Sequence, residues 1–599
     1  MNDEILKYIE EEGLLLNPRI INEVSNENYK NTEFKFIIEG EIEINNITLQ
    51  VACDKFFPIH KPHCFIKSLN SLKMIPHVDK DGEVCYVEDE GLLIDISSET
   101  LVIRDTILRV LKTITEGIQG VNNADFINEF ETYWIYQKNI MFAESIIGLT
   151  NDVKEISVGF FKDYRRFFFG DSTEAIIKYC NKYIKDTLSN RPIFEKATYI
   201  PIRPGTYIFP PNYEAMWNNK FIRNNIINNI TASNKGLLQI LLKDKLHVGS
   251  RIYYVLSIPK PNGTNILIGL EYSGFKKNQC SKNQLVANPL KSVECEFNIR
   301  PIYIERHDKG LLAPRGGASN NIDGKKVAII GCGAVGGYIS MELIKAGVNQ
   351  MTLIDDDILS QNNVYRHTLG VNSILKKANR RYKSQYKVNA LKREIENKLP
   401  FSQIDTITMK IEDILEEKRV DFTKYDLVIM AIGNPTIELY INKYFHEISN
   451  MPPLIITWLE PYGIGGHAFL SNNKNKGCFQ CLFNSPMNDT NEIFNRSSFA
   501  ESGQTFTKAV SGCGSLFTPY SSLDAIQTAI LATRLSVNVL QEKEEDNPLL
   551  SWKGDAQLYL ENGYILSQRY KLTNEMIYNL RYKYKAENCC VCSRGENND

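Results

Sequence analysis

The sequence of 599 residues contains no apolar run near the 18 or so residues that a membrane-spanning helix requires. Its first residues, MNDEILKYIEEEG, are acidic and amphipathic, unlike a secretory signal. Basic residues number 69 and acidic residues 71, so the basic excess of a general nucleic-acid binder is missing. Internal repeats and low-complexity tracts are also missing. We therefore expect a soluble, cytoplasmic protein that contacts neither membranes nor nucleic acids.

The composition that is present is that of a globular protein. Apolar residues make up 43% of the chain, and its length predicts about three or four domains. The 13 cysteines are an odd number in a chain expected in a reducing compartment, so grouped cysteines indicate a metal site or catalysis rather than disulfides. Six cysteines are notable for their spacing or setting: Cys85, Cys478, Cys481, Cys513, Cys589 and Cys592.

Two blocks of mixed structure are expected before residue 301. Residues 1–148 are predicted to form an α+β domain, in which an N-terminal helix and an antiparallel meander precede a polar, cysteine-bearing loop. Helical stretches are expected near residues 98–116 and 125–147. Residues 149–300 are predicted to form a mixed linker domain with a hairpin turn near residues 259–263, and we assign no chemistry to it.

Residues 301–599 alternate predicted strands and helices. Apolar, β-branched runs alternate with helical stretches from residue 325 onward. This alternation favours an α/β fold with a doubly wound, mostly parallel sheet of the Rossmann type. A late hairpin with Asn562-Gly563 at its turn is expected to add antiparallel structure at the edge.

A glycine-rich turn separates the first strand of this block from a helix. Gly331, Gly333 and Gly336 form G-x-G-x-x-G, where the backbone can approach a phosphate and the helix N-terminus supplies amide donors. The next strand ends in Asp355-Asp356-Asp357, near the spacing at which a carboxylate holds ribose hydroxyls. Taken alone, this pattern indicates a dinucleotide-binding dehydrogenase. The alternative is a glycine-rich turn that binds no ligand.

The residues after the acidic run argue against hydride transfer. Asn363 and Arg366 follow Asp357, and Lys387 comes later in the segment KVNAL. This order resembles the D-x-D-x(5)-N-x-x-R stretch, followed by a lysine, of ubiquitin-activating-type adenylating enzymes, which include the bacterial ThiF and MoeB forms. The resemblance implies that ATP and Mg²⁺ bind, with Asp355, Asp357 and Asn363 facing ribose or metal and Arg366 and Lys387 facing the triphosphate. The alternative is a solvated polar loop with a surface lysine.

The chain departs from this family at one position. Family members carry an acidic residue in a D-N pair that helps to hold Mg²⁺, whereas this chain has Gly433-Asn434. Glycine cannot ligate a metal, so another carboxylate such as Asp357 must take the role, or adenylation is weak. Some members also insert an arginine from the dimer partner, and Arg306 and Arg315 are both candidates for it here.

Two C-x-x-C pairs lie far apart near the C-terminus. Cys478 and Cys481 form the first, and Cys589 and Cys592 the second. Four thiolates at this spacing suit tetrahedral Zn²⁺, which would clip the chain end onto the domain. The same family carries C-x-x-C-L-F and C-P-V-C at matching places, which supports a structural site. Cys590 is a possible substitute ligand, and unpaired buried thiols are the alternative.

Cys513 lies between these pairs, among small residues before a helix expected over residues 521–540. Small neighbours keep a thiol accessible, and a helix N-terminus lowers its pKa. In the resembled family, the loop at this place holds the cysteine that takes the activated acyl group as a thioester. Some members lack that cysteine, so a structural cysteine is the alternative.

Cys85 ends the motif Gly82-Glu-Val-Cys85, which follows Pro76-His77-Val78. With a meander before it and helices after it, this segment resembles the ubiquitin-conjugating fold, whose members show H-P-N and then G-x-[IV]-C. The asparagine that stabilises the oxyanion is absent here. His77 or a backbone amide is a candidate to replace it, and a loop-packing role is the alternative for His77. We expect Cys85 to be a second nucleophile, and an ordinary, partly buried cysteine is the alternative.

Together these resemblances identify the chain as a member of the CD-NTase-associated activating–conjugating fusions of CBASS antiviral operons. This implies an ATP-dependent ubiquitin-like transferase that adenylates the C-terminus of a protein partner, a cGAS-like CD-NTase. The acyl group would pass from Cys513 to Cys85 and then to a target amine, and the enzyme would be a homodimer. One alternative is a ThiF/MoeB-like adenylyltransferase serving sulfur transfer. Another is a non-catalytic scaffold that binds nucleotide and a partner tail, as Gly433 and the missing asparagine suggest.

Overall fold

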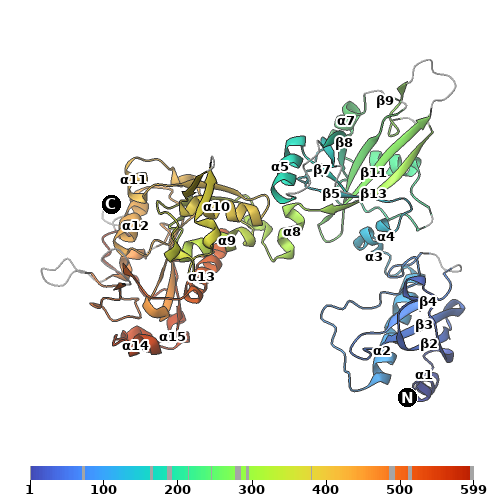
Figure 1. Ribbon diagram of the computed structural model, residues 1–599, viewed down its shortest axis with the longest axis horizontal. Helices are drawn as coiled ribbons and strands as arrows, with labels where there is room; N and C mark the ends of the chain where they lie inside the picture. The colour runs from blue at the N-terminus through green and yellow to red at the C-terminus, as the bar shows by residue number, and fades with distance from the viewer. Residues whose placement is uncertain are drawn as a thin grey trace. The chain divides into compact units, whose positions relative to one another are not determined.

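The computed structural model falls into two compact units, Met1–Asp308 and Lys309–Asp599 (Figure 1). The structure describes residues 2–69, 74–161, 166–184, 192–213, 215–243, 246–247, 249–276, 285–291, 296–378, 381–475, 477–483, 493–509, 516–544 and 546–593. Among the helices of these residues, none combines the length and the apolar character needed to cross a membrane.

The first unit begins with a four-stranded antiparallel sheet in the order β1-β2-β3-β4. Its elements are α1 (Asn2–Glu11), β1 (Leu16–Ile21), β2 (Phe34–Ile42), β3 (Ile47–Asp54), β4 (His63–Ile66), α2 (Glu99–Gln119), α3 (Asp125–Asn128) and α4 (Phe130–Ile135). Apolar side chains of β2, β3, β4 and α2 form one core. The expected helix near residues 98–116 is confirmed as α2, which begins after the N-cap Ser98 and ends at left-handed Gly120.

A closed barrel in the order β10-β11-β13-β5-β7-β6-β8 completes the first unit. Its strands are β5 (Met141–Ser145), β6 (Lys154–Phe160), β7 (Phe167–Gly170), β8 (Ile193–Pro201), β10 (Ile252–Pro259), β11 (Asn265–Lys276) and β13 (Glu296–Arg306). The further elements are α5 (Thr173–Tyr183), α6 (Asn219–Asn228), α7 (Ala232–Leu241) and the paired short strands β9 (Leu246–His247) and β12 (Leu285–Val286). The predicted hairpin is confirmed, since β10 and β11 are antiparallel with Pro259 opposite Asn265.

The expectation of a helix over residues 125–147 is wrong beyond Ile135. The segment forms the two short helices α3 and α4, and Asn139 then adopts a left-handed conformation before β5 begins. β5 pairs with β13 and β7, which are distant in sequence. This non-local pairing overrides the local helical pattern, and the barrel therefore extends beyond residues 149–300 at both ends, through β5 and the end of β13.

The second unit is built on a seven-stranded sheet in the order β18-β15-β14-β19-β20-β21-β24. Its strands are β14 (Lys326–Ile330), β15 (Gln350–Ile354), β18 (Gln403–Ile407), β19 (Leu427–Met430), β20 (Leu454–Leu459), β21 (Gly465–Ser471) and β24 (Leu549–Lys553). The strands from β18 to β20 are parallel, whereas β21 is antiparallel to both of its neighbours. The predicted α/β architecture is confirmed. The strand order changes direction at β14, and such switch points bind ligands at the carboxyl ends of the strands.

Helices and short hairpins surround this sheet. The helices are α8 (Lys309–Arg315), α9 (Ala334–Ala346), α10 (Lys387–Lys398), α11 (Ile411–Glu416), α12 (Pro435–Glu447), α13 (Ser522–Leu540), α14 (Gln557–Glu561) and α15 (Asn574–Asn579). The hairpins are β16 (Leu375–Ala378) with β17 (Arg381–Ser384), and β22 (Lys508–Ala509) with β23 (Leu516–Phe517). The expected late hairpin is wrong, because α14 occupies its first arm and Gly563, at φ +83°, follows the helix end. Asn-Gly also suits a helix C-terminus, so this turn signal was ambiguous.

Candidate nucleotide site, cysteine cluster and thiol loop

The glycine-rich turn lies at the carboxyl end of β14, against the end of β19. Gly331 has a φ of +86°, and a Cβ atom there would come within 2.7 Å of the Ala431 carbonyl oxygen, so this position requires glycine. A Cβ atom on Gly336 would lie 1.9 Å from the Gly331 oxygen. Gly333 is the N-cap of α9 and has open space around it. The two packed glycines therefore leave the middle one open to a phosphate.

Asp355 ties this turn to the acidic run. One of its carboxylate oxygens accepts the Cys332 backbone N–H at 2.7 Å, and the other accepts the Asp357 N–H at 2.8 Å. Burial raises the pKa of Asp355, and the two backbone donors oppose that rise. Asp355 thus fixes the position of the glycine turn relative to Asp357.

Lys387 reaches the acidic run from the first residue of α10. Its Nζ atom lies 2.5 Å from Oδ2 of Asp357, and its backbone N–H donates to the Asp357 carbonyl oxygen at 2.9 Å. Lys387 is 8% exposed, so a nearly buried ammonium group is held at the edge of the site. Oxygen atoms of Asp355, Asp356 and Asp357 lie within 4.8 Å of one another, which fits the oxygen ligands that Mg²⁺ prefers.

Asn363 and Arg366 lie in the turn after the acidic run. Oδ1 of Asn363 accepts the Ser360 N–H at 3.1 Å and the Ser360 hydroxyl at 3.0 Å, so this oxygen is used within a capping box. The Arg366 guanidinium lies over the Tyr520 ring, 5.0 Å from its centroid. Tyr520 comes seven residues after Cys513, so the end of the Cys513 loop contacts the nucleotide site.

His367 is a residue of this site that the sequence analysis did not single out. Its Nδ1 accepts the Leu369 N–H at 3.1 Å, so its Nε2 carries the proton and donates to the Cys332 carbonyl oxygen at 2.8 Å. Burial lowers the pKa of His367, which favours this neutral form. The ring therefore holds the carbonyl group of Cys332, whose N–H group is held by Asp355. The feature of the sequence that could have pointed to His367 was its position directly after Arg366.

A buried carboxyl group next to Gly433 was also missed. Glu438, in the first turn of α12, is 1% exposed, and its Oε1 accepts the Gly433 N–H at 2.9 Å. Burial raises the pKa of Glu438 to about 7. Position 433 has no acidic side chain, but Glu438 brings a carboxyl group close to it, at the same end of β19. Acidic residues are common in first helical turns, so the sequence offered no distinguishing signal.

Glu438 should make the folded state less stable as the pH rises from about 5 to about 8. A carboxyl group with a folded pKa of about 7, above its ordinary 4.5, binds a proton more tightly in the folded than in the unfolded state. Glu438→Gln keeps an acceptor for the Gly433 N–H and removes the titration. From the low to the high end of this pH range, the free energy of unfolding of the variant should therefore rise by up to about 3 kcal/mol relative to that of the wild type. Chemical denaturation at several pH values measures the difference, and Glu447→Gln, an exposed site on the same helix, is the control. If the free energies of unfolding of the wild type and Glu438→Gln changed with pH in the same way, this prediction would be contradicted.

The two candidate arginines lie in different settings. Arg306 donates through Nε and Nη2 to both oxygens of Asp308, at 2.7 and 2.9 Å, and also donates to the Asn265 carbonyl oxygen. Its side chain is 8% exposed, so it is committed to the first unit. Arg315 is the exposed last residue of α8 in the second unit. Of the two, Arg315 is the one with a solvent-facing guanidinium.

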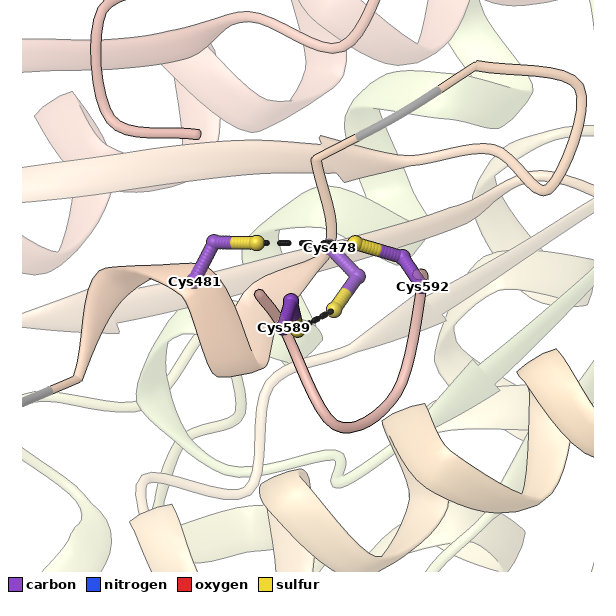
Figure 2. Close-up of side chains that lie close together, drawn as sticks. All are labelled: Cys478, Cys481, Cys589 and Cys592. Atoms are coloured by element: carbon purple, nitrogen blue, oxygen red, sulfur yellow. Dashed lines mark hydrogen bonds between the residues drawn. The ribbon is translucent and has the colours of Figure 1, made fainter. Parts of the chain in front are cut away.

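The C-terminal cysteines gather into one cluster (Figure 2). The sulfur atoms of Cys478 and Cys589 are 3.6 Å apart, as are those of Cys481 and Cys592. A disulfide needs about 2.05 Å, whereas sulfurs around tetrahedral zinc, at about 2.3 Å from the metal, lie about 3.8 Å apart. The cluster therefore fits a structural zinc ion with a complete set of thiolates. Cys590 is exposed and lies outside the cluster.

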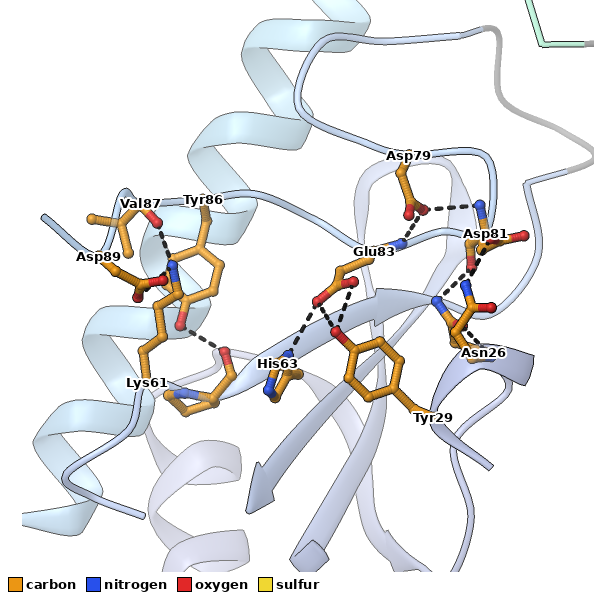
Figure 3. A network of polar contacts seen from close by, with 12 residues as sticks. Asn26, Tyr29, Lys61, His63, Asp79, Asp81, Glu83, Tyr86, Val87 and Asp89 are labelled. Atoms are coloured by element: carbon orange, nitrogen blue, oxygen red, sulfur yellow. Dashed lines mark hydrogen bonds and ion pairs between the residues drawn. The ribbon is translucent and has the colours of Figure 1, made fainter. Parts of the chain in front are cut away.

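Cys85 is exposed on the loop that follows β4. Gly82 has a φ of +87°, and a Cβ atom there would lie 2.5 Å from the Ile66 carbonyl oxygen, so the G-x-V-C motif needs its glycine to pack against β4. Glu83 accepts the Tyr29 hydroxyl at 3.0 Å and lies 3.1 Å from Nδ1 of His63 (Figure 3). Packing around the sulfur, and then the Glu88 carboxylate, raise the pKa of Cys85. The loop thus presents a protonated thiol on a rigid base.

His77 is held away from the thiol chemistry by two carboxylates. Its Nε2 lies 3.1 Å from Asp125 and its Nδ1 lies 2.9 Å from Glu129, and these carboxylates, Glu129 first, raise the pKa of His77 to about 9. Both ring nitrogens are therefore engaged at neutral pH, which favours the loop-packing role. The His77 carbonyl oxygen accepts the Cys85 N–H at 2.8 Å. Of the two candidates to replace the missing asparagine, His77 is therefore the one that these contacts disfavour.

Cys513 lies outside the described residues. Before and after it, β22 and β23 pair antiparallel. The helix expected over residues 521–540 is confirmed as α13, and its N-cap Ser521 forms a capping box with Asp524. The second unit therefore holds the nucleotide residues and the cysteine cluster, and the first unit holds Cys85.

Two segments of the chain match known protein families. Residues 16–143 match Prokaryotic E2 family B, and this segment contains the Cys85 loop. Residues 312–549 match the ThiF family, and this segment contains the glycine turn, Lys387 and Cys513.

Relatives with curated names span most of the chain. A Pseudomonas aeruginosa protein named ATP-dependent ubiquitin transferase-like protein Cap2 is 22% identical over 484 residues, covering 78% of this chain and 79% of that protein. An Escherichia coli protein of the same name is 22% identical over 578 residues, covering 89% and 90%. Among solved structures, E. coli MccB aligns with a TM-score of 0.30 at 18% identity, over 39% of this chain and 61% of that chain.

Proposed function

Because the chain joins a prokaryotic E2 family B domain to a ThiF-family domain, we propose that it is an ATP-dependent ubiquitin-like transferase of antiviral (CBASS) defence. One observation carries the proposal. A single chain combines a glycine turn flanked by the Lys387–Asp357 pair with an exposed cysteine, Cys85, on an E2-like loop. The relatives named as ATP-dependent ubiquitin transferase-like proteins support it.

In the first step, the C-terminal carboxylate of a protein partner attacks the α-phosphorus of ATP. A new O–P bond forms, the bond between the α- and β-phosphates breaks, and pyrophosphate leaves. The turn from Gly331 to Gly336 holds the phosphates, and Lys387 and Arg366 balance the charge that develops on them. Asp355 and Asp357 would hold Mg²⁺, which supplies further positive charge when bound. The Asn363 amide nitrogen is left to face the ribose.

In the second step, two thiols carry the acyl group in turn. The Cys513 thiolate attacks the acyl carbonyl and AMP leaves, which conserves the activation as a thioester. The Cys85 thiol then displaces Cys513, and an amine of the target displaces Cys85 to form an amide. Burial raises the pKa of Cys85, so the attacking thiol gives up its proton as it reacts, and the departing Cys513 sulfur takes a proton to leave as a thiol.

The other participants in this scheme follow from the family resemblance. It implies that a cGAS-like CD-NTase donates the tail, that a lysine amine accepts it, and that a second copy of the chain is the dimer partner. In such a homodimer, we assign the arginine that reaches the nucleotide of the other copy to the exposed Arg315, because Arg306 is bound to Asp308. Zn²⁺ on the four C-terminal cysteines has a structural role in this scheme.

The relay predicts opposite behaviour for two variants. Cys85→Ala should keep an ATP-dependent thioester of the partner on Cys513 and abolish transfer to the target. Cys513→Ala should abolish both adducts. Intact-mass spectrometry and non-reducing gels of the enzyme with ATP and the CD-NTase partner measure these species. Cys590→Ser, at an exposed thiol outside the cluster, is the control and should behave as the wild type.

The remaining outcomes separate the alternatives. Conjugation that persists in Cys85→Ala would refute the relay, and a Cys85 adduct in Cys513→Ala would reverse its order. Pyrophosphate exchange without any thiol adduct would favour an adenylyltransferase that serves sulfur transfer. Absence of exchange with every partner tail would favour a nucleotide-binding scaffold.

A further inference from the structure

One segment beside the nucleotide site has a charge pattern unlike the rest of the chain. Residues 358–393 contain nine Lys or Arg residues and no Asp or Glu. Acidic residues are 71 of 599 overall, so a segment of this length would contain about four. Basic residues are 69 of 599 overall, so a segment of this length would contain about four, and the nine found here are about twice that number.

The hairpin β16–β17 carries much of this charge on its surface. The four exposed cations of the hairpin are Lys376, Lys377, Arg381 and Lys383. In the part of the chain that the structure describes, none of these four side chains pairs with a carboxylate. The two strands pair from Leu375–Ser384 to Ala378–Arg381, so the cations are held on an ordered ladder. The described residues of the hairpin therefore present positive charge that no carboxylate among the described residues neutralises.

The base of the hairpin is bonded to the backbone of the nucleotide site. The Leu359 N–H donates to the Gln385 carbonyl oxygen at 2.9 Å, and the Gln385 side-chain amide donates to Ser373 at 2.6 Å. The next hydrogen bond along joins Lys387 to Asp357. The hairpin is thus an extension of the segment that carries the catalytic lysine.

A groove of about 470 Å³ lies between the hairpin and α10. The charged residues that line it are Lys376, Lys392, Arg393 and Glu396. Three of them are cations, and the single carboxylate lies 3.8 Å from Lys392. Tyr386 lines the same groove and is 40% exposed, and Tyr382 on the hairpin is 68% exposed. Tyrosine and arginine are enriched on surfaces that bind proteins, and this groove offers Tyr386 and Arg393.

We propose that the hairpin β16–β17 and this groove bind an acidic segment of the protein partner, upstream of the C-terminal carboxylate that is adenylated. This inference rests on the proposed function, which brings a polypeptide tail to the glycine turn. Attraction between the basic hairpin and an acidic segment speeds association and orients the tail before its carboxylate enters the site. A polypeptide is favoured over a nucleic acid because the neighbouring site acts on a carboxylate.

A charge-reversal pair of variants tests the docking surface in the full chain. The hairpin variant combines Lys376→Glu, Lys377→Glu, Arg381→Glu and Lys383→Glu. The control variant carries the same change of net charge at exposed residues of another surface: Lys410→Glu, Lys418→Glu, Arg419→Glu and Lys424→Glu. The probes are a fluorescein-labelled glutamate-rich peptide, the same peptide with serine in place of glutamate, and single-stranded DNA of similar length.

Fluorescence anisotropy should show that the wild type binds the glutamate-rich peptide in preference to the serine peptide, with an affinity that falls as salt is added. The hairpin variant should bind it about tenfold more weakly or worse, and the control should match the wild type. Equal binding by the two variants, or no preference for glutamate, would overturn the proposal. Hairpin-dependent DNA binding that is tighter than peptide binding would reassign the surface to nucleic acid.

The same samples separate this inference from the proposed function. A fluorescent ATP analogue reports whether each variant keeps its nucleotide site. Peptide binding needs no ATP, so its result stands whether or not pyrophosphate exchange occurs. If exchange is absent while hairpin-dependent peptide binding is present, the proposed function fails and the docking surface remains. The reverse result overturns the docking surface alone.

Discussion

Replacing Lys387 with alanine is expected to slow partner-dependent ATP–pyrophosphate exchange by about 100- to 1,000-fold. The Lys387 ammonium is nearly buried and held 2.5 Å from Asp357, so it is already in place when charge develops on the phosphates. Such a preorganised charge acts mainly on the transition state, and the loss should therefore appear in kcat more than in the KM for ATP. Initial rates of exchange of radiolabelled pyrophosphate into ATP measure both constants.

Two further variants make this result specific. Lys387→Met keeps the length of the side chain without its charge, so it should be as slow as Lys387→Ala if the charge matters. Lys424→Ala removes an exposed lysine that lies 3.4 Å from Asp421 on another surface, and it should match the wild type. An exchange rate for Lys387→Met close to that of the wild type would remove Lys387 from the adenylation step.

Loss of one cysteine of the C-terminal cluster is expected to have the largest effect on stability. Cys592→Ser should reduce bound zinc from about one ion per chain to nearly none and lower the melting temperature of the second unit by about 10 °C. The cluster joins the C-terminal segment that holds Cys589 and Cys592 to the segment after β21 that holds Cys478 and Cys481. Of these four side chains, Cys478, Cys481 and Cys589 are buried. Without the ion, thiolates in this cluster repel one another, and the segment that carries Cys589 and Cys592 loses its link through the metal to Cys478 and Cys481.

Cys590→Ser is the matched control, because Cys590 lies between two of the proposed ligands but is exposed. It should keep both the zinc and the melting temperature. Elemental analysis by mass spectrometry measures the metal, and differential scanning calorimetry measures the transition. Zinc in Cys592→Ser at the level of the wild type, or wild-type protein that holds no metal after purification with zinc present, would contradict a structural zinc site.

Residues whose roles depend on near neighbours in the sequence were found without the structure. The glycine turn was recognised because its spacing places each glycine at a set position between a strand and a helix, and Gly331 and Gly336 indeed have no room for a side chain. The same holds for Gly82, which precedes Cys85 at a fixed distance. In each case the covalent spacing along the chain already determines the local geometry.

Residues whose roles depend on distant contacts were missed or left undecided. His367 braces the turn at Cys332, and Glu438 lies against Gly433, and both contacts are with residues that are not their neighbours in the sequence. The choice between Arg306 and Arg315 was open until the structure showed Arg306 bound to Asp308. His77 was a candidate for the oxyanion until Asp125 and Glu129 were found on both sides of its ring.

The amino-acid order alone determined the α/β class of the second unit, the nucleotide turn with its acidic run, and the two cysteine pairs. These features follow from periodicity and spacing, which act within a few residues or one strand–helix unit. Only the tertiary structure decided the closure of the barrel by β5 and β13, the exclusion of Cys590 from the cysteine cluster and the burial of Glu438. Strand pairing and desolvation depend on residues that are far apart along the chain, and local patterns do not determine which of these residues will meet.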